Sequence, residues 1–253
     1  MRYEIRGEGA NPVVLIHEMG GTLETWDFMV DELAARWPVI RFDMRGCGLS
    51  EWQPGRVSVD MLADDIAGLL EHLRIKGKAV VIGCAVGGAV AIHFAARHPQ
   101  LTAGLVAMSP AVGVAEERKA ATLKRADDLM VEGMRPTLNQ RLANSYPQAM
   151  RDDPQRFSDI RNRRLGAGMH GMSELTRLVA TLDMTDDYAK ITCPTLIVAG
   201  LHDGDRPPAV VKPIADRIAG AHFEQLTTGH FMPLQTPDLV LATITPFIGG
   251  CIA

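Results

Sequence analysis

The sequence predicts an α/β protein with a doubly wound, mostly parallel sheet and one helical insertion. Three observations support this: short apolar runs recur along the chain, helical segments separate them, and one long charged segment interrupts the alternation. Runs that are apolar at consecutive positions suit strands covered on both faces. Parallel strands need helical crossovers, so the alternation predicts right-handed βαβ units. The predicted strands are Pro12–Ile16, Val39–Asp43, Ala79–Gly83, Leu105–Ser109 and Thr195–Gly200.

Two segments between these strands have the spacing of helices. Apolar side chains recur at helical spacing in Val59–Leu73, and Ala89–Arg97 is typical of a buried helix that follows a glycine pair. Residues 112–188 are charged and rich in methionine, and prolines and glycines divide them into short helices. We expect a core of residues 1–111 and 189–253, with 112–188 as a helical cap over the sheet's carboxyl edge. The alternative is that these helices belong to the layers flanking the sheet.

Composition and charge exclude several classes of function. A formal net charge of -4 gives no reason to expect nucleic acid as a partner. No apolar run approaches the roughly 20 residues of a membrane span, and the first residues lack a signal peptide's apolar stretch. We therefore expect a cytoplasmic protein with no membrane partner, and the sequence leaves its oligomeric state open. The cysteines have no C-x-x-C spacing, so neither zinc nor a redox pair is indicated; they are Cys47, Cys84, Cys193 and Cys251.

The segment from Gly83 to Gly87 has the form of a nucleophile elbow. Such an elbow, G-x-S-x-G, directly follows a strand and opens a helix. Its tip has a strained backbone, so the residues two before and two after must be nearly free of side chain. Gly83 and Gly87 meet this requirement around position 85, where the chain has alanine instead of serine. The sequence therefore has every feature of the turn except the hydroxyl.

Cys84 is the alternative nucleophile in this turn. With Cys84 at the tip, the small flanking positions would be Ile82 and Val86, whose branched side chains would crowd the backbone. We therefore keep Ala85 at the nucleophile position. Ala85 is either an introduced replacement of serine, which we favour, or the natural residue of a non-hydrolytic protein.

The elbow and three further motifs carry a resemblance to a known family. Along its whole length the chain resembles the α/β-hydrolase superfamily, and within it most resembles the 3-oxoadipate enol-lactonase and small carboxylesterase group. The other motifs are the oxyanion loop His17–Thr22, the turn Asp43–Ser50, and the loop Gly229–Pro237 with its early histidine. The second of these is a fold signature, in which Asp43 and Arg45 are expected to form a structural network.

The family's chain order of nucleophile, acid and histidine implies the catalytic roles. That order gives residue 85, then Asp203, then His230. Asp203 directly follows a predicted strand and fits the family pattern better than Asp205, which we expect to be a solvated turn residue. His202 and His222 have no comparable motif and are expected to be surface or structural residues.

The resemblance also implies an oxyanion hole and a set of substrate contacts. The backbone N–H groups of Met19 and Val86 would hold the developing oxyanion, and Trp26 lies at a familiar distance downstream. Glu18 replaces the usual glycine; we expect a salt-bridged structural residue, and a substrate contact is the alternative. Enol-lactonases act on small acidic lactones, so Arg161 and Arg164, with Arg163, could hold a substrate carboxylate. For any single arginine we favour a solvated helix face.

The function implied is hydrolysis of a small carboxylic ester or lactone by a Ser-His-Asp mechanism, here with an inactivating alanine. Neither a metal nor an organic cofactor is expected, and the partner is a small-molecule substrate. Three alternatives stay open. The scaffold could cleave C–C or amide bonds with the same triad. A natural Ala85 protein could act as a lyase, an isomerase or a cofactor-free catalyst with His230 as base. It could also bind a ligand without turnover.

Overall fold

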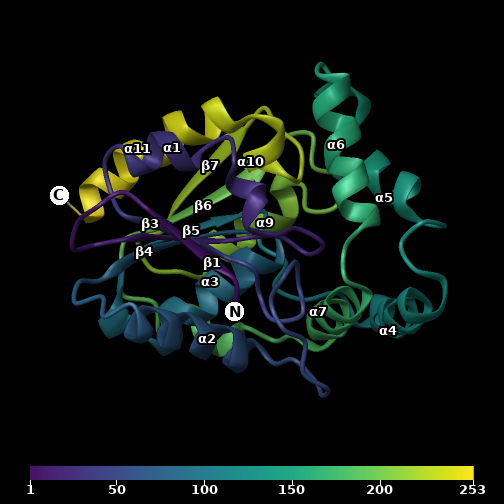
Figure 1. Ribbon diagram of the computed structural model, residues 1–253, viewed down its shortest axis with the longest axis horizontal. Coiled ribbons are helices and arrows are strands. Elements are labelled where there is room, and N and C mark those ends of the chain that lie inside the picture. Colours follow the sequence, from purple (N-terminus) through teal and green to yellow (C-terminus); the bar gives the residue numbers. More distant parts are fainter. Residues whose placement is uncertain (253) are drawn as a thin grey trace.

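The computed structural model describes residues 1–252 and contains a seven-stranded sheet with the order β1-β3-β2-β4-β5-β6-β7. Strand β1 is antiparallel to β3, and every other pairing is parallel. The α/β fold with a mostly parallel sheet is thus confirmed (Figure 1). The strands are β1 Tyr3–Arg6, β2 Val13–Ile16, β3 Val39–Phe42, β4 Ala79–Cys84, β5 Thr102–Met108, β6 Thr195–Gly200 and β7 His222–Leu226.

The two edge strands, β1 and β7, were not predicted from the sequence. Most of their residues are exposed or half-buried, whereas β2, β3, β4 and β6 are buried throughout. An edge strand with a solvated face lacks the continuous apolar run by which the central strands were recognised. The expected runs therefore identify the interior of the sheet and miss its borders.

Helices connect the strands and cover both faces of the sheet. Helix α2 matches the expected segment, and α3 begins three residues before the expected start, directly after Ala85. No helix among residues 1–252 is long and apolar enough to cross a membrane. The helices are α1 Val30–Ala34, α2 Val59–His72, α3 Val86–Arg97, α4 Glu116–Glu132, α5 Leu138–Ser145, α6 Pro154–Leu165, α7 Met169–Thr181, α8 Thr185–Tyr188, α9 Pro208–Ala215, α10 Met232–Gln235 and α11 Pro237–Cys251.

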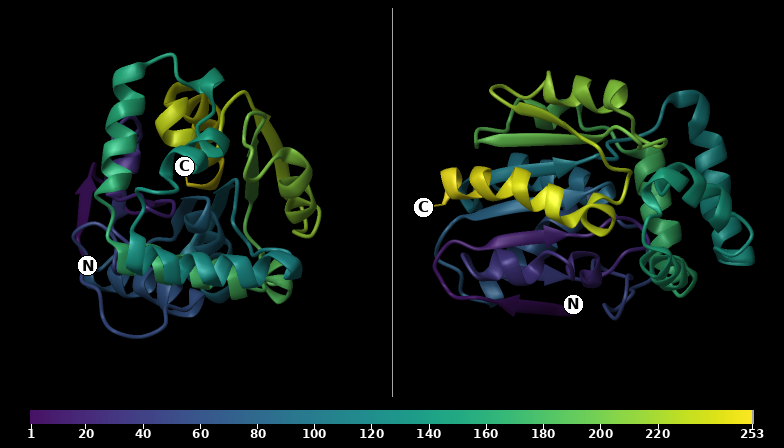
Figure 2. Two further views of the ribbon diagram at one scale, coloured as in Figure 1. Left: turned by 90° about the vertical axis from the view of Figure 1, so that its right-hand side faces the viewer. Right: turned by 90° about the horizontal axis from the view of Figure 1, so that it is seen from above.

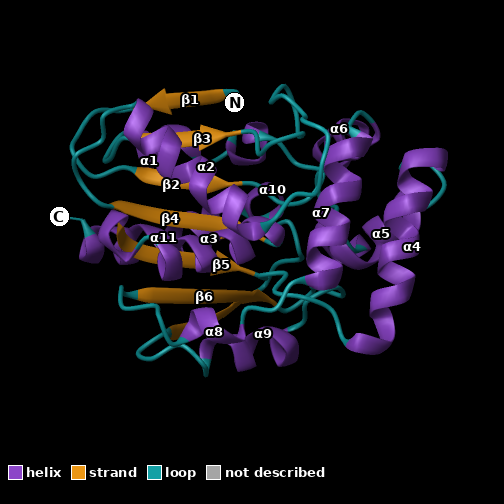
Figure 3. Ribbon diagram, turned by 90° about the horizontal axis from the view of Figure 1, so that it is seen from below, coloured by secondary structure: helices purple, strands orange, loops and turns teal. Residues whose placement is uncertain are grey.

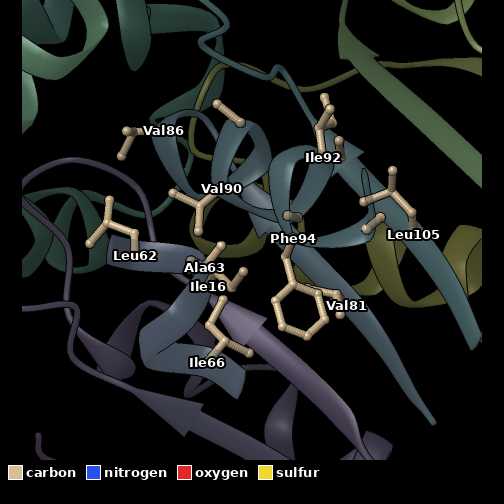
Figure 4. Packing of buried hydrophobic residues seen from close by; sticks show 14 of the residues in the cluster. Ile16, Leu62, Ala63, Ile66, Val81, Val86, Val90, Ile92, Phe94 and Leu105 are labelled. Atoms are coloured by element: carbon tan, nitrogen blue, oxygen red, sulfur yellow. The ribbon is translucent and has the colours of Figure 1, made fainter. Parts of the chain in front are cut away.

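Alternate side chains of each central strand enter separate cores on the two faces. On β2, Val14 and Ile16 join the cluster formed with α2 and α3, while Val13 and Leu15 join the cluster formed with α1 and α11. Figure 4 shows the first cluster, in which Phe94 of α3 packs near β2 and β4 residues. Burial on both faces explains why the strands are apolar at consecutive positions.

Helices α4 to α7 are grouped beyond one end of the strands (Figures 2 and 3). Helices α4 and α7 pack along each other, and the Ser173 hydroxyl donates to the Ala126 carbonyl at 2.8 Å. This group has an apolar cluster of its own, which also includes Phe231 and Leu234 from the core. Helix α8 instead packs on α3, where the His93 ring and the Asp187 carboxylate lie 2.8 Å apart. The group of helices beyond the end of the sheet therefore consists of α4 to α7 and does not include α8.

The Asp43 turn fixes the loops at the carboxyl end of β3. The Asp43 carboxylate accepts hydrogen bonds from the N–H groups of Leu23 and Leu49, each at 2.8 Å. Arg45 pairs with Asp65 through two hydrogen bonds of 2.6 and 2.8 Å. Both side chains therefore belong to a structural network, as the sequence led us to expect.

Candidate active site

Residue 85 lies at the sharp turn between β4 and α3. Ala85 has φ 52° and ψ −115°, a conformation that non-glycine residues rarely adopt and that costs about 1–3 kcal/mol. A Cβ at Gly83 would lie 2.0 Å from the Gly87 carbonyl oxygen, and a Cβ at Gly87 would lie 2.3 Å from the Ile16 carbonyl oxygen. Glycine is required at both positions. The turn therefore has the strained backbone and close packing of an elbow, with Ala85 at its tip.

Cys84 points away from the cavity beside Ala85. Its side chain is fully buried, and its Sγ lies 3.4 Å from the carbonyl oxygen of His230. Burial raises the pKa of the Cys84 thiol well above its ordinary value, with the negative charges of Glu18 and Asp203 adding to the effect. A thiol that resists ionisation is a poor nucleophile. These observations disfavour Cys84 as the reacting group.

The loops after β6 and β7 bring Asp203 and His230 together. The His230 Nδ1–H donates to Asp203 Oδ2 at 2.7 Å. Asp203 Oδ1 accepts from the backbone N–H groups of Asp205 and Arg206, each at 2.8 Å. Burial disfavours the charged carboxylate, but the charge of His230 and these hydrogen bonds hold the pKa of Asp203 below its ordinary value. Since Nδ1 is engaged, Nε2 is the nitrogen left to serve the cavity that His230 lines.

Met19 and Val86 place two backbone amides at the same cavity as Ala85. Val86 is the first residue of α3, so its N–H has no carbonyl one turn earlier to bond. The Met19 N–H donates to no other group within residues 1–252. Both amides are thus available to a substrate oxygen, which is the requirement for oxyanion donors.

One cavity of about 550 Å³ joins these groups. Its floor is formed by residues that follow β2, β4 and β5, among them Glu18, Ala85 and Ala111. Helices α4 and α5 form much of its opposite wall. This volume suits a small molecule. Apolar wall residues include Met134, Leu138, Leu142 and Phe231.

Glu18 forms a buried ion pair with a helix of the α4–α7 group. Its carboxylate lies 2.5 Å from Arg164 Nη2 of α6, and its other oxygen accepts from the Thr25 hydroxyl at 2.9 Å. Arg164 also donates to the Met19 carbonyl at 3.0 Å and lies over the Phe231 ring, 3.7 Å from its centre. Glu18 is therefore a salt-bridged residue, as expected from the sequence, that ties α6 to the loop after β2.

Arg164→Met is expected to lower the free energy of unfolding by about 3–5 kcal/mol, because it leaves the Glu18 carboxylate buried without its partner. The measurement is denaturant unfolding at neutral pH. Arg163→Met is the matched control, since its pair with Asp27 is exposed and should contribute at most about 1 kcal/mol. Equal, small losses in the two variants would contradict the assignment of a buried structural pair.

The comparison with known families agrees with this geometry. Residues 11–237 match the model of the family described as the alpha/beta hydrolase fold. The chain belongs to this family. The resemblance expected from the elbow, the early loops and the histidine loop is thereby confirmed.

Known hydrolases match this chain over nearly its whole length. A thermophilic esterase from Thermogutta terrifontis, solved with malate bound, is 29% identical with a TM-score of 0.93, covering 100% of this chain and 94% of that chain. The enol-lactonase from Burkholderia xenovorans LB400 is 26% identical with a TM-score of 0.90, covering 98% of this chain and 96% of that chain. A pyrrolizixenacetamide deacetylase from Xenorhabdus hominickii is 26% identical, covering 97% of this chain and 93% of the relative.

Two expected substrate contacts of this α/β-hydrolase-fold protein lie away from the cavity. Trp26 is completely buried in the core beneath α1 and α11, so it supports the fold and cannot touch a substrate. Arg161 is not among the residues that line the cavity, and its Nε donates to the Asn139 side chain at 3.2 Å. Of the expected contacts, Glu18 and Arg164 do border the cavity, but they are paired with each other.

A second set of arginines in the cavity wall was not predicted from the sequence. They come from α4, α5 and the loop after β6, and no local motif connects these segments. Each segment contributes only one or two arginines, so composition gave no signal either. The residues are Arg118, Arg125, Arg141 and Arg206.

Within residues 1–252, one group of side chains could hold a metal ion, and it includes the acid and the histidine. Asp203, Asp205 and His230 place one ligand atom each within 4.8 Å of one another. The Nδ1 proton of His230, however, already occupies the space between its ring and Asp203. This arrangement is that of an oriented base, and we assign it no metal.

Proposed function

We propose that this chain has the active site of a small carboxylic-ester or lactone hydrolase, with alanine in place of the nucleophilic serine. The observation that carries the proposal is the meeting of three parts in one cavity: the strained turn at Ala85, the hydrogen-bonded pair of His230 and Asp203, and the free amides of Met19 and Val86. Acyl transfer through a nucleophile requires these parts together.

In the serine form, the Oγ of residue 85 would attack the substrate carbonyl while His230 Nε2 removes its proton. Asp203 would keep the ring oriented and stabilise the imidazolium. The negative charge that develops on the carbonyl oxygen would be held by the Met19 and Val86 amides. His230 would then return the proton to the leaving alkoxide, and water would release the acid by the reverse steps. For a lactone, the alcohol and the acid are the two ends of one opened product.

The named relatives support hydrolysis of an acyl compound and differ in the bond cleaved. They are an esterase, an enol-lactonase and a deacetylase. The test is a panel of p-nitrophenyl esters, lactones and anilides assayed with the Ala85→Ser variant. Turnover of esters or lactones in preference to anilides supports the proposed class, and a preference for anilides would assign the scaffold to amides. We also propose that α4 to α7 act as a cap that determines this preference.

The alanine protein is expected to bind uncleaved substrate. The change from serine removes the bond-forming atom and leaves the amides, His230 and the cavity wall in place, so ground-state affinity should change by about 1 kcal/mol or less. The measurement is calorimetric titration of an ester or lactone that the Ala85→Ser variant cleaves into the Ala85 protein. The product acid is then titrated into both proteins, and its two Kd values are compared. Failure of the Ala85 protein to bind any such substrate contradicts the proposal.

A second candidate function rests on Ala85 itself. His230 is an oriented base, and the tip of the turn at Ala85 has no hydroxyl for it to activate, so it could remove a proton directly from a bound substrate, as in a lyase or isomerase. Codon 85 of the source genome distinguishes the two candidates. A serine codon supports the hydrolase, while an alanine codon together with His230-dependent turnover by the Ala85 protein supports the second.

A further inference from the structure

The wall of the cavity opposite Ala85 carries an excess of positive charge. Two of the arginines project from α4, one from α5 and one from the loop that follows Asp203. With Arg164 already paired to Glu18, Asp205 is the only carboxylate among the residues lining the cavity that remains to balance them. These four residues, called the wall arginines below, are Arg118, Arg125, Arg141 and Arg206.

None of the wall arginines forms a salt bridge with any group of residues 1–252. The Arg206 side chain donates one hydrogen bond, from Nη2 to the Gly113 carbonyl at 2.8 Å. The Nε of Arg125 is buried without a partner. By contrast, Arg41 and Arg45 outside the cavity are each paired with carboxylates at 2.6–2.9 Å. Arg125, Arg141 and Arg206 are half-buried and Arg118 is exposed, so the cluster presents guanidinium groups without a paired carboxylate to the cavity.

The electrostatics of the cluster agree with the geometry. Burial and the neighbouring charge of Arg141 lower the pKa of Arg125 to about 10, in spite of the attraction of Asp205. Burial likewise lowers the pKa of Arg141 and of Arg206. Each guanidinium would gain from an added anion, because such a group would restore both the hydrogen bonds and the charge balance.

We propose that the wall arginines form a subsite for a doubly charged oxyanion group, carried by the part of the substrate remote from its reacting carbonyl. This assignment rests on the proposed function, because it places the reacting carbonyl at Ala85 and His230. Guanidinium groups bind carboxylate and phosphate oxygens through paired N–H donors. The substrate class is therefore a small ester or lactone bearing two carboxylates or one phosphate.

The position of the subsite also connects recognition to the catalytic pair. The backbone N–H of Arg206 donates to Asp203, while the backbone N–H of His230 donates to the Ser145 carbonyl at the end of α5. The segments that carry Arg206 and Arg141 are thus hydrogen-bonded to the acid and to the histidine segment. An anion held by these arginines would be positioned relative to His230 by rigid backbone contacts rather than by a mobile loop.

The test uses the Ala85 protein itself and needs no turnover. Succinate and inorganic phosphate are titrated calorimetrically at constant ionic strength, with acetate as the singly charged comparison. We expect one site per chain for succinate or phosphate and binding of acetate at least about 10-fold weaker. If succinate binds with the lower Kd, the subsite is assigned to dicarboxylates; if phosphate does, it is assigned to phosphates.

Arg125→Gln and Arg141→Gln are each expected to raise the Kd of the more tightly bound dianion by about 10-fold or more. Neither should lower Tm without ligand, since removing one charge relieves repulsion within the cluster. Arg161→Gln is the matched control, because Arg161 lies in the same group of helices but outside the cavity, and it should bind the dianion unchanged. Absence of dianion binding at millimolar concentration would overturn the proposal, as would equal weakening in all three variants.

Failure of this inference can be separated from failure of the proposed function. If Ala85→Ser hydrolyses neutral esters while no dianion binds, the subsite is wrong and the hydrolase stands. If a dianion binds through Arg125 and Arg141 while Ala85→Ser hydrolyses nothing, the subsite stands and the hydrolase is wrong.

Discussion

Ala85→Ser is expected to raise the hydrolysis of a cleavable small ester or lactone by about 10⁴-fold or more over the alanine protein. Without the nucleophile, only binding and the oxyanion donors contribute to catalysis, and these account for a small part of the rate enhancement of such enzymes. The backbone of residue 85 already has φ 52°. A serine there therefore needs no rearrangement to present its Oγ to the cavity. The measurement is kcat/KM for both proteins on the same substrate.

Cys84→Ser in the alanine protein is the control for this experiment. It also adds a hydroxyl to the turn, but at a fully buried position one residue away from the cavity. It should give no activity above that of the alanine protein. A folded Ala85→Ser protein that turns over no ester, lactone or amide would rule out the hydrolase, and activity in Cys84→Ser would place the nucleophile at residue 84.

Much of the fold could be predicted because burial leaves a strong pattern in the central strands. The runs Pro12–Ile16 and Thr195–Gly200 correspond to β2 and β6, which have both faces covered. The edge strands β1 and β7 could not be found in the same way, since exposed residues occur on both faces of β7 and polar residues such as the adjacent Glu224 and Gln225 are therefore tolerated. Short helices such as α1 were missed because five residues are too few for a helical period to be visible.

In the site, too, some residues could be predicted from local sequence and others could not. The elbow and the positions of Asp203 and His230 could be predicted because each depends on a local motif, and the chain order links the motifs. Arg161 was considered as a substrate contact because it is close in sequence to Arg163 and Arg164, whereas its side chain donates to Asn139 outside the cavity. The wall arginines were not predicted, because only the packing of α4, α5 and the loop after β6 brings them together.

His230→Ala, made in the Ala85→Ser background, is expected to lower kcat by about 10⁴- to 10⁶-fold. Loss of the imidazole removes both the base that activates Ser at position 85 and the acid that protonates the leaving group. The fold should tolerate the change. Asp203 keeps its two backbone N–H donors at 2.8 Å and therefore is not left as an unpaired buried charge. The measurements are kcat and Tm on the same preparation.

His202→Ala is the matched control for this variant, since His202 is exposed, lies next to Asp203 in the chain, and joins the His230 loop only through its backbone N–H. It should leave kcat unchanged. If His230→Ala kept its activity and His202→Ala lost it, the base would be His202, and the bond between His230 and Asp203 would be structural. A large fall in Tm for His230→Ala would also indicate that the bond between His230 and Asp203 is structural. Asp203 keeps its backbone N–H donors without the ring, so a purely catalytic pair should leave Tm nearly unchanged. Loss of kcat at constant Tm is the result that only a catalytic His230 explains.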